Sequence, residues 1–127
     1  MSEKKMPVPT ESQEQIAVIN WASYMSNRDP RYGLLFHIPN GGSRGKAEAG
    51  RFRAEGVKSG VPDLFLPVPV GVYAGAFVEM KRIRDGRVSE EQKNWLVALQ
   101  NQGYFAKVCY GAEDAIRTLK SYMEGHT

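Results

Sequence analysis

Two carboxylates and a lysine lie where the expected strands begin and end. Asp63 follows the turn Gly60-Val61-Pro62, and Glu79 and Lys81 stand at the end of an apolar run. Residues two apart on a strand project from the same face, so Glu79 and Lys81 would point together while Met80 points the other way. If the strand that starts at Asp63 pairs as a hairpin with the strand that ends at Lys81, Asp63 and Glu79 converge at one end of the sheet.

This grouping suits phosphodiester hydrolysis. Two carboxylates and the backbone carbonyl of Met80 are hard oxygen ligands of the kind that Mg²⁺ or Mn²⁺ prefers, with positions left for water and phosphate. Such an ion acidifies its bound water and neutralises charge that grows on the phosphate. Lys81 could orient or deprotonate that water, or offset the negative charge of the pentavalent state. A lysine beside two carboxylates stays protonated, which favours the electrostatic role.

The same spacing has a plainer interpretation. Asp63 could cap a turn, and Glu79 and Lys81 could form a surface ion pair worth under about 1 kcal/mol. The neighbours Phe77 and Val78 favour the first interpretation, because they embed Glu79 in an otherwise apolar strand.

The elements that would position these residues can be read from capping and periodicity. Thr10 with Gln13, and Ser89 with Gln92, form capping-box patterns that begin helices. In the first half we expect a helix over 11–25, a buried strand over 34–38 and a basic helix over 46–55 ended by Gly56. A strand over 63–66, a hairpin-like connection over 67–75 and a strand over 76–81 follow. The last elements are a helix from 90 to Gly103 with Trp95, Leu96 and Leu99 at core spacing, a strand over 104–110 and a helix over 112–124. This order predicts an α/β fold with a mixed sheet flanked by helices.

Composition sets the class of protein. The chain has 127 residues, 42% of them hydrophobic, which is enough for the core of one domain. It contains no apolar run of about 18 residues and no apolar stretch at its start, so we expect neither a membrane partner nor a signal peptide, and a cytoplasmic location. Cys109 is the one cysteine, which excludes an intrachain disulfide. Residues 1–9 read as a flexible lead-in, and residues 10–125 as a single domain.

Basic residues cluster in two segments of a chain whose net charge is +3. The first cluster contains Arg44, Lys46, Arg51, Arg53 and Lys58, and the second contains Lys81, Arg82, Arg84 and Arg87. Both could be solvated surfaces, or both could face an anionic partner. The loop Asn40-Gly41-Gly42-Ser43-Arg44 could bring backbone N–H groups close to a phosphate, or it could be an ordinary Asn-Gly turn.

At this point the chain resembles the VRR-NUC nucleases of the PD-(D/E)XK superfamily, from about Glu11 to Tyr110. The resemblance rests on five motifs in order, namely Glu11-x-x-x-Gln15, His37-Ile38-Pro39-Asn40-Gly41-Gly42, Gly60-Val61-Pro62-Asp63-Leu64, Glu79-Met80-Lys81 and Val88-Ser89-Glu90-Glu91-Gln92-Lys93. It implies a restriction-endonuclease-like core and a nuclease that acts on DNA with Mg²⁺ or Mn²⁺ and no small-molecule cofactor. Single-domain members look like Holliday-junction resolvases, which act as homodimers on branched DNA.

The resemblance also assigns residues. Asp63, Glu79 and the Met80 carbonyl would be metal ligands, together with Glu11 from the first helix, and Lys81 would be the catalytic lysine. Glu14 competes with Glu11 for the first-helix position. The residues expected to contact DNA are Gln15, Asn40, Gly41, Gly42, Arg44, Lys46, Arg51, Arg53 and Gln92.

Some assignments have open alternatives. Gln92 could serve as a helix cap or contact the substrate, and His37, between Phe36 and Ile38, is better explained as a structural histidine than as a ligand. The nuclease could instead cut flaps, single strands or free ends. A DNA-binding module with the nuclease fold and no catalysis is a further alternative, although the expected acidic residues and Lys81 are all present.

Overall fold

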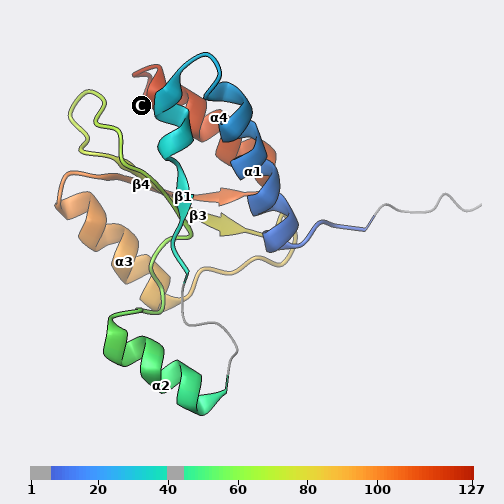
Figure 1. Cartoon of the computed structure of the whole chain (residues 1–127), viewed down its shortest axis with the longest axis vertical. Helices are drawn as coiled ribbons and strands as arrows, with labels where there is room; N and C mark the ends of the chain where they lie inside the picture. The colour runs from blue at the N-terminus through green and yellow to red at the C-terminus, as the bar shows by residue number, and fades with distance from the viewer. Residues whose placement is uncertain (1–6, 40–44) are drawn as a thin grey trace, which may run out of the picture.

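The computed structural model describes residues 7–39 and 45–127. Its elements are α1 (Glu11–Met25), the 3-10 helix η1 (Pro30–Leu34), β1 (Phe36–His37), α2 (Lys46–Glu55), β2 (Leu64–Leu66), β3 (Ala76–Lys81), α3 (Glu90–Asn101), β4 (Phe105–Tyr110) and α4 (Ala112–Met123) (Figure 1). Apart from η1, the helices and strands follow the expected order. In the part of the chain that is described, no helix is long and apolar enough to cross a membrane.

The four strands form one mixed sheet in the order β1-β2-β3-β4. β2 and β3 run antiparallel, with Leu64 opposite Val78, whereas β3 and β4 run parallel, with Val78 opposite Lys107. The helix α3 connects the parallel pair, which cannot be joined by a tight turn. All residues of β3 are buried, so the strand that carries the candidate residues is covered on both faces.

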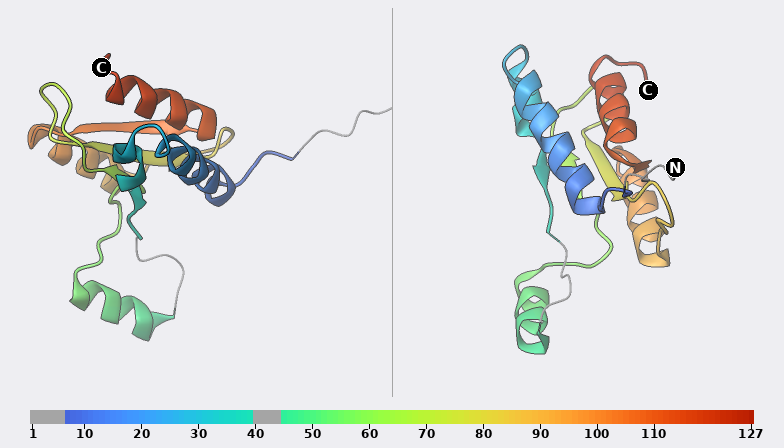
Figure 2. Two further views of the ribbon diagram at one scale, coloured as in Figure 1. Left: turned by 45° about the horizontal axis from the view of Figure 1, so that its top comes forward. Right: turned by 90° about the vertical axis from the view of Figure 1, so that its right-hand side faces the viewer.

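Helices cover both faces of the sheet (Figure 2). α1 and α4 pack on one face, in a core cluster that includes Val78 and Met80 of β3. α3 packs on the other face, where Leu96 contributes to a smaller cluster with Phe77. Because neighbouring strand residues point to opposite faces, Glu79 points to the α3 side and Met80 into the α1–α4 core, as the sequence predicts.

The helix α2 stands apart from the sheet and from the other three helices, as both ribbon views show (Figures 1 and 2). None of its residues is buried, and Gly56 ends it with a left-handed φ of 101°, a conformation that glycine adopts without steric cost. Residues 57–63 lead from it to β2. The expected basic helix therefore forms, and it forms as a projecting arm.

Most local expectations are confirmed. Both capping boxes are made, by Thr10 with Gln13 and by Ser89 with Gln92. The segment 67–75 connects β2 to β3 as a hairpin, and β2 begins one residue later than expected.

The strand expected over 34–38 is wrong in length and in burial. Only Phe36–His37 pairs, and both residues are exposed. The Asp29 side chain accepts the Arg31 N–H and forms an ion pair with its guanidinium at 2.7 Å, so the chain turns through η1 before it becomes extended. β1 then lies at the edge of the sheet, where an apolar run need not be covered.

Candidate active site

Asp63 and Glu79 meet where β2 begins and β3 ends. Asp63 directly precedes β2, and the antiparallel register of β2 with β3 sets it beside Glu79. The Asp63 Oδ2 accepts the Met80 N–H at 2.8 Å, which ties this carboxylate to β3. The Asp63 backbone carbonyl accepts the Ile38 N–H and contacts His37 Nδ1, both at 2.8 Å, so His37 makes a structural contact as expected.

Glu79 and Lys81 form a buried pair. Glu79 is 1% exposed and Lys81 is 6% exposed, which excludes the surface ion pair considered above. Lys81 Nζ lies 3.8 Å from Glu79 Oε1, and Gln92 Nε2 donates to the same oxygen at 3.2 Å. Glu79 Oε2 is also buried, and no donor among the described residues bonds to it. Buried carboxylate oxygens are normally hydrogen-bonded, so this oxygen is available to a ligand that the protein itself does not supply.

Gln92 joins the start of α3 to the carboxylates. Its Oε1 accepts the Ser89 N–H at 2.9 Å, and its own N–H donates to Ser89 Oγ at 3.1 Å. The amide nitrogen of the same side chain then bonds to Glu79. The expected cap is therefore formed, and the amide nitrogen of Gln92 also links α3 to Glu79 of β3.

The electrostatics of the pair are dominated by burial. Burial, the negative charge of Asp63 and a side-chain hydrogen bond with Asp63 together raise the pKa of Glu79 to about 9. Lys81 acts in the opposite direction, and the more distant Glu11 adds a smaller increase. With only these side chains present, Glu79 holds a proton at neutral pH, because the single ammonium does not balance two desolvated carboxylates.

The two acidic residues at the start of α1 have different partners. Glu14 is buried, and its Oε2 accepts the Ala112 N–H at the start of α4. The N-cap residue of α4 is Gly111, which has no side chain to do this, and a carboxylate is favoured at that end of a helix dipole. Glu11 is exposed and contributes to the pKa of Glu79. Glu14 is therefore engaged at the start of α4, whereas Glu11 is exposed.

Comparison with known proteins now decides the family. The VRR-NUC domain profile matches residues 10–113, a span that contains every residue of the site described above. The chain belongs to the VRR-NUC family. A solved structure described as "VRR_NUC domain protein" superposes with a TM-score of 0.78 at 29% sequence identity, over 94% of this chain and 93% of that chain. A comparison with curated protein sequences gives no match.

Membership implies the class of activity. A VRR-NUC domain is a nuclease domain of the PD-(D/E)XK type, and its substrate is DNA. The mixed sheet flanked by helices is the restriction-endonuclease-like fold, as the sequence predicted. Nucleases of the VRR-NUC family generally use divalent metal ions.

The carboxylate pair of this VRR-NUC domain fits a divalent metal ion. Asp63 and Glu79 offer hard oxygen atoms, and Glu79 Oε2 is buried without a donor in the described structure. Within residues 7–39 and 45–127, no three Asp, Glu, His or Cys side chains gather into a group that could hold a metal. Glu11 is therefore not part of a ready-made three-carboxylate cluster with Asp63 and Glu79.

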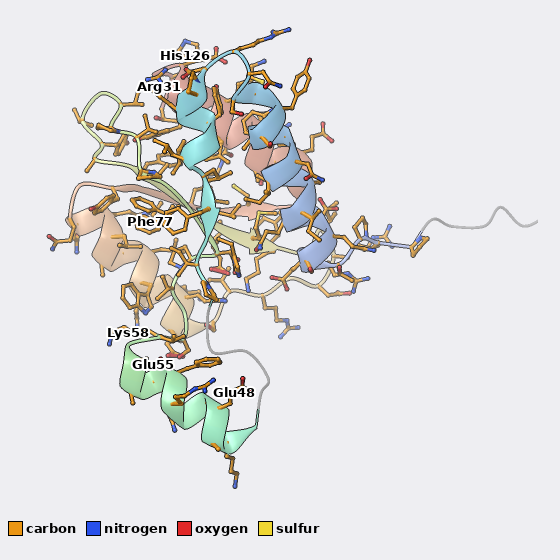
Figure 3. The ribbon with its side chains drawn as sticks, viewed as in Figure 1. Arg31, Glu48, Glu55, Lys58, Phe77 and His126 are labelled. Atoms are coloured by element: carbon orange, nitrogen blue, oxygen red, sulfur yellow. The ribbon has the colours of Figure 1, made fainter. Side chains whose placement is uncertain are left out.

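The residues expected to contact DNA are only partly within the described structure. Three of them are exposed on the arm α2, namely Lys46, Arg51 and Arg53. Arg51 is engaged on its own helix, 3.7 Å from Glu48 and 3.6 Å from Glu55, two residues labelled in Figure 3. Gln15 is half-buried on α1. Gln92 bonds to Glu79, as described above, and the other four, which are Asn40, Gly41, Gly42 and Arg44, lie outside the described residues.

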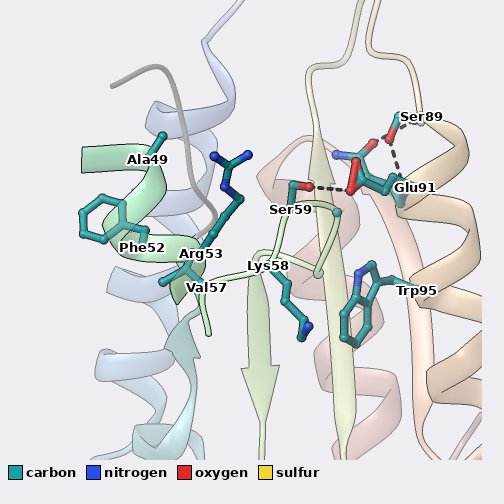
Figure 4. A pocket seen from close by; sticks show the side chains of 11 residues that line it. Ala49, Phe52, Arg53, Val57, Lys58, Ser59, Ser89, Glu91 and Trp95 are labelled. Carbon is teal, nitrogen blue, oxygen red and sulfur yellow. Dashed lines mark hydrogen bonds between the residues drawn. The ribbon is translucent and has the colours of Figure 1, made fainter. Parts of the chain in front are cut away.

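A groove of about 900 Å³ between α2 and α3 adds residues that the sequence motifs did not single out (Figure 4). Arg53, Lys58 and Trp95 line it, and Gln92 lines the part next to the carboxylates. The spacing that predicts Trp95 in the core is wrong on this point, because Trp95 is only half-buried and faces the groove. Its position three residues after Gln92, on the same helix face, is the sequence signal that could have placed it here.

Proposed function

We propose that this VRR-NUC domain is a DNA endonuclease that depends on Mg²⁺ or Mn²⁺ and resolves four-way junctions as a homodimer. The observation that carries the metal dependence is the buried Glu79 Oε2, which lacks a donor among the described residues beside a second carboxylate. Two neighbouring carboxylates, one of them buried, need more positive charge than Lys81 supplies if both are to be ionised.

Asp63, Glu79 and the carbonyl of Met80 are the residues that would hold the ion, with Glu11 as a further carboxylate on the α1 side. A bound divalent ion acidifies a coordinated water and neutralises charge on the phosphate. Asp63 is held in place for this by the Met80 N–H, and Glu79 by Gln92. These contacts fix both side chains before the substrate arrives, which lowers the reorganisation that the reaction requires.

Lys81 is the proposed catalytic cation. Its ammonium lies 3.8 Å from Glu79 and is almost fully buried, where a charge acts more strongly than in water. Its positive charge would stabilise the negative charge that develops on the phosphate. The cut leaves the phosphate on one product strand and a hydroxyl on the other, with water supplying the attacking oxygen.

The proposed DNA contacts come from two helices, α1 and α2. Lys46, Arg51 and Arg53 on α2, with Gln15 on α1, would contact the backbone on either side of the cut, and phosphate contacts of this kind position DNA without reading its sequence. We place the nuclease domain at residues 10–125, after a lead-in of residues 1–9, because the family match starts at residue 10 and α4 continues to Met123.

Junction resolution requires two symmetric cuts, and a two-fold axis would supply two matching sites. The test compares a labelled four-way junction with a flap, a single strand and a continuous duplex, each with Mg²⁺ or Mn²⁺. Paired nicks across the junction support the resolvase. Preferential cutting of the flap, the single strand or a free end would keep the nuclease and discard junction resolution.

The oligomeric state is tested separately. Light scattering with and without junction DNA is expected to give twice the chain mass of 14.2 kDa. A monomer under both conditions would contradict the dimer. Tight junction binding with no metal-dependent cutting of any substrate would instead favour the non-catalytic binding module.

A further inference from the structure

The groove between α2 and α3 has two walls of different character. On the α2 side are Phe52 and Arg53, and on the α3 side is the indole of Trp95, with Lys58 rising from the connecting segment (Figure 4). The α3 wall thus carries an aromatic ring, Lys58 extends from the connecting segment, and Arg53 lies on the opposite wall.

The floor of the groove is fixed to α3. Gly60 has a φ of 86°, and a Cβ at this position would come within 3.1 Å of the Trp95 ring and of the Glu91 backbone. Only glycine allows the segment to pass so close in this conformation. The Ser59 hydroxyl donates to the Glu91 carboxylate beside it. Trp95 therefore has a defined support on one side.

The charge of the lining favours an anion. The lining has a net positive charge, because it contains Arg53 and Lys58 against Glu91, whose carboxylate accepts the Ser59 hydroxyl. An aromatic ring flanked by cations is the arrangement that binds single-stranded nucleic acid, because bases stack on the ring while phosphates meet the cations.

The groove also lies at the right place and has the right size. Gln92 bonds to Glu79, and Trp95 is three residues further along α3, about 4.5 Å along the helix axis. A volume of about 900 Å³ lies in the range of small-ligand sites and is enough for one nucleotide.

We propose that this groove holds one unpaired nucleotide of the DNA next to the phosphate that is cut, with its base stacked on Trp95 and its phosphates bound by Arg53 and Lys58. The inference rests on the proposed function and narrows its substrate. The bound nucleotide would be one that is unpaired, or becomes unpaired on binding, at the branch point of the junction, and a continuous duplex would leave the groove empty.

The test uses the two tryptophans of the chain as reporters. Trp21 lies on α1, away from the groove, and packs edge-on against Tyr32 of η1 with ring centroids 5.4 Å apart. In the Trp21→Phe protein, tryptophan fluorescence comes from Trp95 alone. We expect it to be quenched, in EDTA, by branched DNA with one unpaired thymine and not by a continuous duplex. The Trp95→Phe protein, which reports from Trp21, is the matched control and should show no quenching.

Binding affinity gives the second readout. Trp95→Leu is expected to weaken binding of the branched DNA by roughly 5- to 100-fold and to leave binding of the continuous duplex unchanged. Trp21→Leu should change neither. Lys58→Ala changes an exposed side chain and so tests the same groove without touching the helix packing. The slope of log affinity against log salt concentration should fall by about 1, which corresponds to one lost phosphate contact. Lys120→Ala on α4 is its control.

Equal quenching by both DNAs, or unchanged affinity in both Trp95→Leu and Lys58→Ala, would overturn the inference. Cleavage by the wild-type protein with Mg²⁺ is measured in parallel, so that the two proposals can fail separately. If the wild type cuts normally and the groove variants have no effect, only the proposed nucleotide site is rejected. If the groove binds the nucleotide but no cutting occurs, the proposed nuclease activity is rejected and the nucleotide site stands.

Discussion

Glu79 is the residue of the candidate site whose surroundings are least favourable for a charged side chain. It is 1% exposed, it lies beside Asp63, and one of its oxygens has no donor among the described residues. Such a residue destabilises the metal-free fold, because a buried carboxyl must either keep its proton or carry an incompletely balanced charge. Strongly shifted carboxyl pKa values of this kind are concentrated at functional sites.

The stability cost of Glu79 should depend on pH. The pKa of Glu79 is about 9 in the folded, metal-free protein, against an ordinary value of 4.5. Between these values the unfolded chain releases a proton that the folded chain keeps, so this group lowers stability as the pH rises, and the loss is complete above pH 9. Glu79→Gln does not titrate and should be more stable than wild type at pH 8 by up to about 5 kcal/mol, with no difference below pH 4.5.

Thermal or urea unfolding in EDTA measures this difference across the pH range. Mg²⁺ or Mn²⁺ at pH 8 should then stabilise the wild type and leave Glu79→Gln unchanged, because only the folded wild type binds the ion. If the stability of the two proteins changes in parallel with pH, the pKa of the Glu79 carboxyl is not raised.

The neighbouring carboxylates Glu11 and Glu14 should separate stability from activity. Glu14→Ala removes the acceptor of the Ala112 N–H and is expected to lower the free energy of unfolding by about 1–3 kcal/mol. Glu11→Ala, at an exposed position, should change stability by less than about 0.5 kcal/mol while slowing cleavage by about 10- to 100-fold. Unfolding curves and cleavage rates of the two folded variants provide the comparison, and slow cleavage in Glu14→Ala with normal cleavage in Glu11→Ala would reverse the assignment.

At the scale of elements, the start of α3 is coupled to the end of β3. Ser89 and Gln92 cap α3, and Gln92 also bonds to Glu79 across the gap between helix and strand. A helix cap thereby becomes part of the support of the candidate metal site. The geometry of the carboxylates then depends on how α3 is seated.

The capping box offers a matched pair of variants. Ser89→Ala and Gln92→Ala each break the cap and should each lower stability by about 0.5–2 kcal/mol. Only Gln92→Ala also removes the hydrogen bond to Glu79. Only this variant should therefore need a higher metal-ion concentration for half-maximal cleavage, and it should cut about 10- to 100-fold more slowly. Rates measured over a Mg²⁺ titration test this. Equal effects of the two variants on the rate would mean that Gln92 acts through the helix alone.

At the scale of the molecule, the sequence predicts local structure better than exposure. The capping residues, the hairpin and the alternation along β3 are set by neighbours in the chain, which is why the convergence of Asp63 with Glu79 could be expected. The exposure of β1 and of Trp95 depends on which elements lie beside them. That information comes from the packing of distant segments, and an apolar run cannot supply it.

The placement of α2 is also a property of the whole molecule. The sequence predicts a basic helix, but nothing in it shows that the helix stands off from the sheet and forms a groove against α3 (Figures 1 and 4). Likewise, Glu11 and Glu14 are both plausible from sequence, and only the position of the start of α4 assigns Glu14 to Ala112.

The measurement that tests the central claim most directly is single-turnover cleavage of labelled branched DNA by wild type and by Asp63→Asn, with binding measured on the same proteins. The wild type should cut with Mg²⁺ or Mn²⁺ and not in EDTA. Asp63→Asn should bind the DNA at least as tightly, because a negative charge is removed, and cut about 10²–10³-fold more slowly or not at all. Cutting in EDTA, or cutting by Asp63→Asn at the wild-type rate, would contradict a metal-dependent site built on Asp63 and Glu79.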